Sequence, residues 1–502
     1  MNYLRVPGEV SLAQLQANGS SWSAGMYRTV VIPNSRTQAV GDLLSNTSPF
    51  DRGTEPGSMW YLADSPCHLI RTKALQDHSC LLYPKGDAIT PVNPKVFVDP
   101  HLADGDILMS KDSNVGEVVM VDGDEWGGHM FSGGILRLHP KADRHYFFSF
   151  LKHPLFKTQL LAMVPRGATI AHAKSLWLKC LVPFPNQRDD DKVVRYVAGL
   201  ARSIIAKERA IKLRAKAIQE AITIELATHQ RAKTFRFSPP SYAEVKALGR
   251  LNAGIYGQEY KSKIWLVENY RRGSLTPKES GFRVTPGPSL EIKLLKTRVD
   301  SDTPRPGFYA LVIPTNISEH GTLNRVTYIG TGYTLPLLQQ GDVLFGEAGF
   351  QKGRSVVLLD GIDRCTTNAH GLYARRADAD VTESVFFRCV FDWYRNMRLI
   401  DLMAVGGSGG HFSPEYFESV RIPKFPDAVK AGIAELYHNN TPPPAGPVTL
   451  ASFVSWHDRW NEGLGIWELD REMKSLQRTL LEVQEQIIEG KTVSVPFEDG
   501  EE

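Results

Sequence analysis

The sequence has few cysteines, and it has neither a long apolar run nor a large net charge. The five cysteines are odd in number and scattered along the chain, which argues for reduced thiols and against a disulfide framework. No run approaches the roughly 20 apolar residues that a membrane-spanning helix needs. The first residues also lack the apolar core of a secretory signal peptide. We therefore expect a cytoplasmic protein with no membrane association.

Motifs of several enzyme classes are absent as well. No GxxxxGK[ST] motif is present, so we expect no nucleotide hydrolysis at a P-loop. The glycine stretch at 406–410 lacks the βαβ setting and the downstream acidic residue of a dinucleotide site. There is no Asn-Pro-Pro-aromatic tetrad resembling that of adenine methyltransferases. The Glu-x-Lys at Glu291–Lys293 has no clear upstream aspartate, and a nuclease is kept only as an alternative.

A metal site and a polyanion-binding surface receive little direct support. Cys67, His68, His78 and Cys80 lie within fourteen residues, but their order and spacing match no known zinc motif, so we predict no metal site. The net charge of +3 does not by itself identify a nucleic-acid-binding protein. It permits one if positive charge is concentrated locally.

The sequence does contain a long internal repeat. GDILMSKDSNVGEVVMVDG at 105–123 returns as GDVLFGEAGFQKGRSVVLLDG at 341–361. The other matching pairs are SAGMY (23–27) and NAGIY (252–256), GGILRL (133–138) and HGLYAR (370–375), the aromatic segments 146–164 and 385–405, the glycine stretches PRGAT (165–169) and GGSGG (406–410), and CLVPFP (180–185) and VRIPKFP (420–426). The matches keep their order, and the offset grows only from 229 to 241 residues, which indicates a two-fold duplication. Each copy has the alternation of an α+β domain with a mainly antiparallel sheet.

A heptad-like segment follows each copy. Its apolar positions are Val197, Ala201, Ile204, Ile211, Ala215, Ile218 and Ile222 in the first segment, and Ile466, Leu469, Met473, Leu476, Leu480, Val483 and Ile487 in the second. Glu208 is a polar break in the first, and NNTPPPAGPVT at 439–449 interrupts the chain before the second. Residues 193–228 hold seven basic and three acidic side chains, whereas residues 464–489 hold three basic and six acidic side chains. Opposite charge favours pairing of the two helices, and separate packing of each on its own domain is the alternative.

A helical spacer between two similar domains suggests a function. The first helix would span roughly 55 Å at 1.5 Å per residue, and one turn of B-DNA is about 34 Å. Two diverged domains held at such a spacing could read two different half-sites, because base contacts depend on individual side chains.

Together these features resemble the specificity (S) subunit of type I restriction–modification systems. The shared marks are the GD-[I/V]-L hairpin, a short Gly-Ser/Ala turn, a strand ending in PFP-like prolines and a coiled-coil helix. RLNAGIY at 250–256 also resembles the motif that opens many domains of this family. The chain departs from the family in having NQRDDDK at 186–192 where an EQ opening is usual, and in its proline-rich insert.

The resemblance implies two target recognition domains and two antiparallel conserved-region helices. The implied boundaries are 1–186 for the first domain, 187–231 for the first helix, 232–426 for the second domain, 427–490 for the interrupted second helix and 491–502 for an acidic tail. It also implies a non-catalytic protein that holds two methyltransferase subunits on a bipartite, asymmetric site in double-stranded DNA and can also recruit a nuclease–translocase. S-adenosylmethionine, ATP and Mg would be bound by those partners and not by this chain. Another DNA-methylation or phage-defence system and a protein-binding scaffold are the alternatives.

The candidate DNA contacts lie in the hairpin tips, in the glycine stretches and in short basic clusters expected on loops. Polar tips that differ on a matched scaffold suit two readers of different sequences, and glycines let backbone N–H groups approach phosphate. The candidates in the first copy are Lys111, Ser113, Asn114, Arg166, Gly167, Thr169, His172 and Lys174. Those in the second are Arg271, Arg272, Gln351, Lys352, Arg354, Arg375, Arg376, Gly407, Ser408 and His411.

Overall fold

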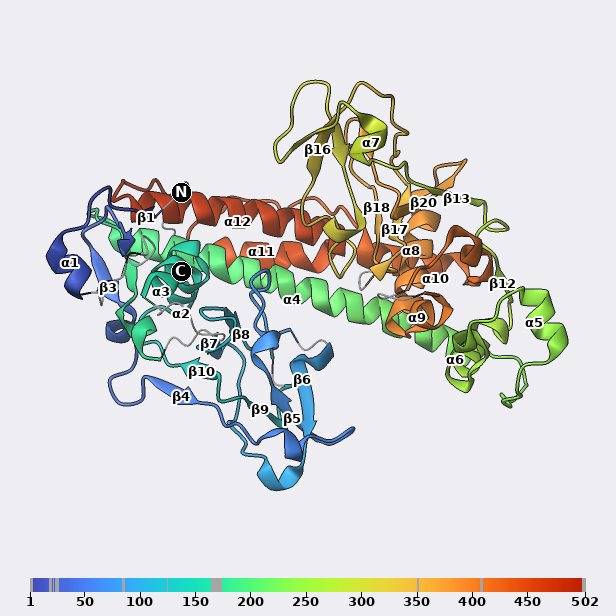
Figure 1. Ribbon diagram of the computed structural model, residues 1–502, viewed down its shortest axis with the longest axis horizontal. Helices are drawn as coiled ribbons and strands as arrows, with labels where there is room; N and C mark the ends of the chain where they lie inside the picture. The colour runs from blue at the N-terminus through green and yellow to red at the C-terminus, as the bar shows by residue number, and fades with distance from the viewer. Residues whose placement is uncertain are drawn as a thin grey trace. The chain divides into compact units, whose positions relative to one another are not determined.

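The chain folds into two compact units, which we call unit 1 and unit 2 (Figure 1). The computed structural model describes residues 3–17, 20, 22, 27–83, 86–123, 125–163, 174–349, 352–406 and 410–498. Unit 1 consists of Met1–Arg209, Pro442–Glu462 and Arg471–Glu502, and unit 2 of Ala210–Thr441 and Gly463–Asp470. Each unit therefore combines one copy of the repeat with a segment from farther along the chain.

The sheets of unit 1 are built by the first copy. A four-stranded antiparallel sheet has the order β4 (Phe50–Arg52), β10 (Ile135–Leu138), β7 (Ile107–Ser110) and β8 (Val118–Met120). A second sheet has the order β6 (Ile89–Val92), β5 (Cys67–Ile70) and β9 (His129–Phe131), with β5 and β9 parallel. Two-stranded sheets join β11 (Leu181–Pro183) to β3 (Thr37–Ala39), and β1 (Leu4–Arg5) to β2 (Thr29–Val30). The helices of this copy are α1 (Leu12–Ala17), α2 (Arg144–Lys152) and α3 (Pro154–Met163).

Unit 2 repeats this plan with the second copy. Its four-stranded antiparallel sheet has the order β13 (Phe282–Pro286), β20 (Gly371–Arg376), β17 (Val343–Gly346) and β18 (Ser355–Val357). The next sheet has the order β14 (Val299–Ser301), β16 (Thr327–Gly330), β15 (Tyr309–Leu311) and β19 (Cys365–Thr366), with β15 and β19 parallel. A two-stranded sheet joins β12 (Ser274–Leu275) to β21 (Ile422–Pro423). The helices are α5 (Tyr242–Leu248), α6 (Gln258–Glu268), α7 (Ile292–Leu295), α8 (Val381–Asn396), α9 (Leu399–Met403) and α10 (Asp427–Tyr437).

The four-stranded sheets of the two copies therefore share strand order and direction. The second sheets share the order β6-β5-β9 and β16-β15-β19 with one parallel pair each, and β14 is an additional edge strand of unit 2. The mainly antiparallel α+β fold that the sequence predicts is confirmed, and the matched strand orders support its duplication. Even individual contacts recur. The hydroxyl of Tyr146 in α2 donates to the carbonyl of Pro183 at 2.7 Å, and that of Tyr394 in α8 donates to Arg421 at 2.9 Å. In both copies a buried tyrosine thus ties the helix to the proline-containing strand.

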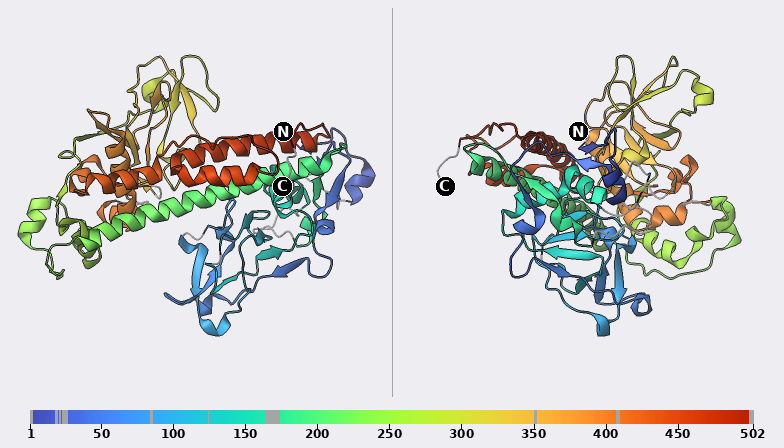
Figure 2. Two further views of the ribbon diagram at one scale, coloured as in Figure 1. Left: turned by 180° about the vertical axis from the view of Figure 1, so that it is seen from behind. Right: turned by 60° about the vertical axis from the view of Figure 1, so that its left-hand side comes forward.

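Three further helices complete the units, namely α4 (Asp190–Thr228), α11 (Phe453–Gly463) and α12 (Ile466–Ile488). In unit 1, the first part of α4 shares one hydrophobic core with α11 and the last part of α12, through residues such as Val197, Phe453 and Val483 (Figure 2). Just before α4, the Gln187 side chain donates to the carbonyl of Val493 beyond the end of α12, at 3.1 Å. The two helices are therefore antiparallel within this unit, as expected.

All of the predicted heptad positions lie at least partly inside the fold. Val197, Ala201, Ile204, Ile211, Ile218, Ile222, Ile466, Leu469, Val483 and Ile487 are buried, and Ala215, Met473, Leu476 and Leu480 are half-buried. The polar break has a structural role. The carboxylate of Glu208 accepts the backbone N–H of Cys80 at 2.8 Å and that of Leu81 at 3.3 Å, and also the hydroxyl of Ser79. One heptad position is thus used to bind a turn of the first copy.

Other features weighed from the sequence can be placed in the fold. Cys180, Cys365 and Cys389 are buried, and all five cysteines are free thiols. Along the described stretches, no group of three metal-ligating side chains comes together. No helix among the described residues combines the length and apolar character needed to cross a bilayer.

Two buried histidines should make unit 1 sensitive to acid. His153 and His457 are 3% and 6% exposed, and burial lowers their pKa values from 6.5 to about 4 and about 3. Below pH 6.5 the unfolded chain takes up protons that the folded chain does not, so the free energy of unfolding should fall as the pH is lowered. His457 should account for about 2 kcal/mol of this loss between pH 7 and pH 5.

His457→Phe tests this expectation, because the new ring would stay packed between Phe453 and Trp456. Urea denaturation of the variant should show a smaller loss of stability between pH 7 and pH 5 than denaturation of the unsubstituted chain. An equal loss in both proteins would contradict the assignment.

Candidate nucleic-acid interface

The hairpin of the first copy is built on a glycine and an aspartate. Gly105 has a φ of +82°, a backbone conformation that favours glycine, and it turns the chain into β7. The carboxylate of Asp106 accepts the backbone N–H of Ala103 at 2.8 Å, and it lies 3.0 Å from the Arg137 guanidinium on the neighbouring strand β10. The Gly-Asp pair therefore closes the turn and fastens the hairpin to the next strand.

The second copy repeats this arrangement with a tighter ion pair. Gly341 has a φ of +86°, and the carboxylate of Asp342 accepts the backbone N–H of Gln339 at 2.7 Å. Arg375 in β20 donates to both carboxylate oxygens, at 2.7 and 2.6 Å, and also to the carbonyl of Leu337 at 2.9 Å. This candidate lies on a strand rather than on the expected loop, and its guanidinium is held by the scaffold.

The tip of the first hairpin is packed against its own domain. The Asn114 side chain donates to the carbonyls of Thr72 and Leu75 at 2.9 and 2.8 Å. Lys111 lies 3.0 Å from the carboxylate of Asp112. Both predicted contacts are half-buried, so this tip is a rigid, partly neutralised surface.

The tip of the second hairpin is held by different partners. Lys352 pairs with Asp401 of α9 at 2.6 Å, and only 11% of its side chain is exposed. Arg354 donates to the carbonyl of Ile317 at 3.1 Å, and burial lowers the pKa of its guanidinium. The two hairpins therefore share the Gly-Asp turn and the flanking strands, whereas their tips differ in length, sequence and ion pairing.

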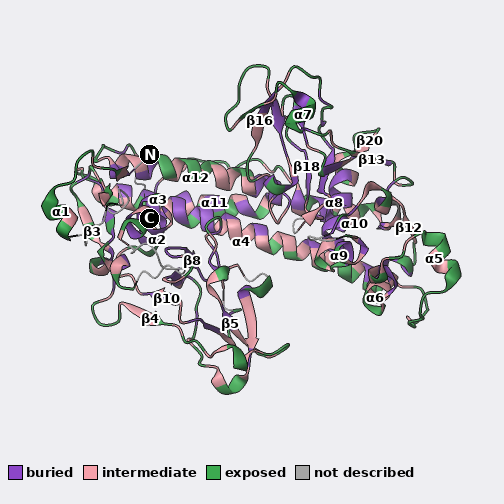
Figure 3. Ribbon diagram, viewed as in Figure 1, coloured by how far each residue is buried: buried purple, intermediate pink, exposed green. Residues whose placement is uncertain are grey.

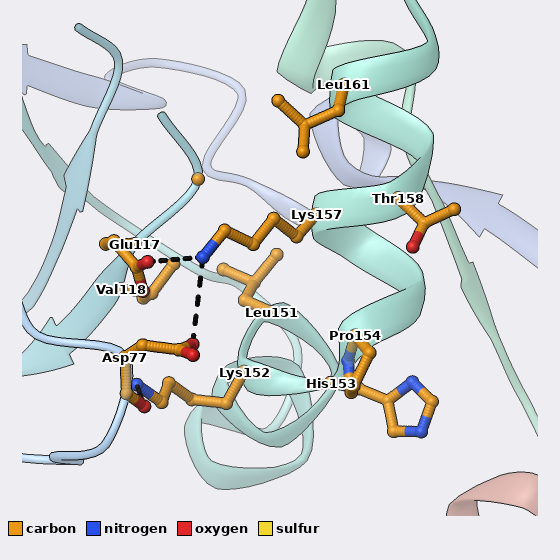
Figure 4. Close-up of a pocket in the computed structure, with 11 residues that line it drawn as sticks. Asp77, Glu117, Val118, Leu151, Lys152, His153, Pro154, Lys157, Thr158 and Leu161 are labelled. Atoms are coloured by element: carbon orange, nitrogen blue, oxygen red, sulfur yellow. Dashed lines mark hydrogen bonds and ion pairs between the residues drawn. The ribbon is translucent and has the colours of Figure 1, made fainter. Parts of the chain in front are cut away.

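A pocket of about 210 Å³ lies beside the first hairpin, between it and helices α2 and α3 (Figure 4). The Lys157 ammonium points across it from α3 to the carboxylates of Glu117 and Asp77, and it lies 3.8 Å from that of Asp77. Glu117 follows Gly116, whose φ is +85°. In the second copy the residue after the corresponding glycine is Arg354, so the charge next to this turn has the opposite sign.

The remaining candidates fall into three groups. Arg376 also lies on β20, where it donates to both oxygens of Asp378. Those exposed at the surface are Ser113, Lys174, Arg271, Arg272 and His411, the last with Nδ1 3.4 Å from Glu347. Arg166, Gly167, Thr169, His172, Gln351, Gly407 and Ser408 lie outside the described residues. All of these DNA contacts remain predictions.

Sequence reasoning missed the carboxylates that hold the hairpin cations. Asp342 could have been suspected from the sequence, because the Gly-Asp pair occurs in both copies and an arginine lies in the following strand in both. Asp401 could not, since it comes from a helix with no fixed sequence distance from Lys352. The tertiary fold alone brings that pair together.

The chain matches no protein-family model and no curated protein. Its fold is similar to the S subunit of the type I restriction–modification system from M. genitalium, with a TM-score of 0.42 and 10% identity over 90% of this chain and 95% of that chain. A structure of a type I restriction–modification complex matches with a TM-score of 0.28 and 11% identity, covering 92% and 99% of the two chains. The HsdS subunit from Thermoanaerobacter tengcongensis matches with a TM-score of 0.26 and 12% identity, covering 92% of this chain and 99% of that chain. With TM-scores below 0.5, the argument for function rests on the residues of this chain.

Proposed function

We propose that the protein is the DNA-sequence specificity subunit of a type I restriction–modification complex. Its two recognition domains would each read one half of a bipartite, asymmetric site. The observation that carries this proposal is the pair of hairpins, β7–β8 and β17–β18, which share strand order and a Gly-Asp anchor but present different tips.

This combination suits sequence reading. Phosphate contacts position a protein on DNA, whereas discrimination depends on individual side chains at the base edges. A domain that recognises a DNA sequence needs a scaffold that holds the hairpin tip in place. It also needs a tip whose residues can be substituted without disturbing that scaffold. The ion pairs and backbone hydrogen bonds described above supply the first requirement, and the difference between Glu117 and Arg354 illustrates the second.

The proposal assigns no catalytic step to this chain. Methyl transfer from S-adenosylmethionine would belong to two methyltransferase subunits, and ATP- and Mg-dependent cleavage to a nuclease–translocase subunit where one is present. The helices α4 and α12 would provide the spacer between the recognition domains and the surface that these cytoplasmic partners bind.

Selection from a library of random duplexes tests the proposal directly. The full chain should enrich two fixed half-sites separated by a constant spacer, and a modified-base map of the source genome should contain the same pair. Exchanging residues 111–115 for 347–352 should change one half-site and leave the other, and the reciprocal exchange should change the other half-site. If no sequence is enriched, or if the chain binds only proteins, the proposal is wrong.

A further inference from the structure

A cluster of basic residues lies where the chain leaves the C-terminal end of α4. Residues 229–231 pair antiparallel with residues 269–271, in the loop that follows α6. The backbone N–H of Arg231 donates to the carbonyl of Asn269 at 3.0 Å, and that of Arg271 donates to His229 at 2.8 Å. This crossing brings together two short basic segments that are about 40 residues apart in the sequence.

Buried side chains hold the two segments of the crossing together through hydrogen bonds. Tyr270 is fully buried, and its hydroxyl donates to the carboxylate of Glu225 in α4 at 2.6 Å. The Asn269 side chain donates to Gln230 Oε1 at 2.9 Å and to the carbonyl of Arg231 at 3.1 Å. The backbone at this crossing is therefore fixed, and with it the points from which the basic side chains extend.

Four of these cations are exposed and uncompensated, and we call them the crossing patch: Arg231, Lys233, Arg271 and Arg272. Within the described parts of the chain, none of the four forms an ion pair. The nearby carboxylate of Glu225 is already used, since it accepts Tyr270 and lies 3.2 Å from His229. The patch contrasts with the hairpin cations, whose charges are balanced by aspartates. The Arg231 guanidinium reaches Gly273 of the other segment. Positive charges gathered at one crossing repel one another, and a polyanion would relieve that repulsion.

Unit 1 contains an equivalent junction, formed by the end of α12 and the loop before β3. The backbone N–H of Asn34 donates to the carbonyl of Ile488 at 3.0 Å, and its side chain donates to Ile487 at 2.7 Å. Here, however, the cations are balanced. Arg36 pairs with Asp190 at 2.5 Å, and Lys491 pairs with Glu489 at 2.5 Å. The same architecture thus carries a basic patch in unit 2 and a neutralised surface in unit 1. In Figure 3, α5 of unit 2 is mostly exposed, whereas α6 is partly buried.

We infer that the crossing patch binds the sugar–phosphate backbone of duplex DNA and anchors unit 2 independently of base sequence. This inference rests on the proposed function and adds an asymmetry to it, because unit 1 lacks the corresponding anchor. The three arginines can each present two N–H donors to one phosphate, and the lysine adds a point charge. Neutralising phosphates releases counterions, so the patch should contribute to affinity in a strongly salt-dependent way.

The test compares full-length variants on the duplex selected by the unsubstituted chain and on a scrambled duplex. Replacing all four cations, in R231Q/K233Q/R271Q/R272Q, should reduce the slope of log affinity against log salt by about 3 to 4, which is about 0.9 for each lost phosphate contact. The ratio of affinities for the selected and scrambled duplexes should stay unchanged. R231K/R271K/R272K, which keeps the charge, should retain most of the slope.

R36Q/K491Q is the matched control, since it removes two cations from the equivalent junction of unit 1. Its slope should equal that of the unsubstituted chain. All four patch side chains are exposed, and circular dichroism should show that each variant is folded.

The possible outcomes separate the inference from the function on which it rests. If the unsubstituted chain selects a site but the four-fold variant keeps its salt slope, the inference is wrong and the proposed function stands. The inference also fails if the variant loses the affinity ratio, because the patch would then read bases. Tighter patch-dependent binding to RNA than to the duplex would identify RNA as the ligand and overturn it. If the unsubstituted chain binds no duplex at all, both proposals fail.

Discussion

Phe453→Ala should destabilise unit 1 by about 3–5 kcal/mol, although this residue lies far along the sequence from the first copy of the repeat. The Phe453 ring is 4% exposed and belongs to the core that contains α2 and the β7–β8 hairpin. Its centroid lies 5.3 Å from that of Phe497 and 6.1 Å from that of Tyr196 in α4. Truncation would leave a cavity that these rings cannot fill. Hydrogen exchange should therefore accelerate in β7, β8 and β10.

Leu481→Ala is the matched control for this substitution. Leu481 lies on α12 and is 44% exposed, so its truncation should cost less than about 1 kcal/mol. In Phe453→Ala, the strands β17, β18 and β20 of unit 2 should keep their protection from exchange, because the core that contains Phe453 includes no residue of these strands. Equal loss of protection in both units would show that they do not fold around separate cores.

Asp342→Ala should destabilise unit 2 by about 3–5 kcal/mol, the cost of breaking a buried ion pair by removing one partner. The Asp342 side chain is 1% exposed and accepts two hydrogen bonds from Arg375 and one from the backbone N–H of Gln339. Its removal would leave a partly buried guanidinium without a counter-charge. Urea denaturation and exchange of the β17 and β20 amides measure this effect.

The duplication provides an internal control for this experiment. Asp106→Ala removes the equivalent carboxylate of the first copy, which is 15% exposed and faces Arg137 at 3.0 Å. Since Arg137 also lies 4.0 Å from the carboxylate of Asp51, it would keep a counter-charge, and we expect a smaller loss, of about 1–2 kcal/mol. The same variants test the role of Arg375. If Asp342→Ala left stability unchanged and altered the salt dependence of DNA binding, Arg375 would be a DNA contact rather than part of the scaffold.

The repeated elements could be predicted because their signals are local and occur twice. Gly105 and Gly341 mark the same left-handed turn, and the apolar strands on either side of each hairpin set its register. The heptad positions were predicted for a similar reason, since a period near 3.5 residues specifies which face of a helix is buried.

The charges at the candidate site could not be assigned in the same way. From the sequence, Lys352, Arg375 and Arg376 look like free cations on loops, but each is paired with a carboxylate in the fold. Arg271 is exposed, as the sequence predicts. Arg231 lies beside it at the crossing, but no motif in the sequence marks Arg231 as a candidate DNA contact. Whether a cation is available for DNA depends on neighbours that the sequence order does not specify.

The sequence by itself determined that this protein contains two copies of one α+β domain, each followed by a helix with one apolar face. Only the tertiary structure decided where those helices end. The last part of α12 belongs to unit 1 and the last part of α4 to unit 2, so each helix begins in one unit and ends in the other. The physical reason is that the hydrophobic effect is not directional. An apolar stripe in the sequence shows which face of a helix must be buried, but it does not show which part of the protein buries it. Specific partners, such as Glu208 for the turn at 79–81 and Tyr270 for Glu225, make that choice.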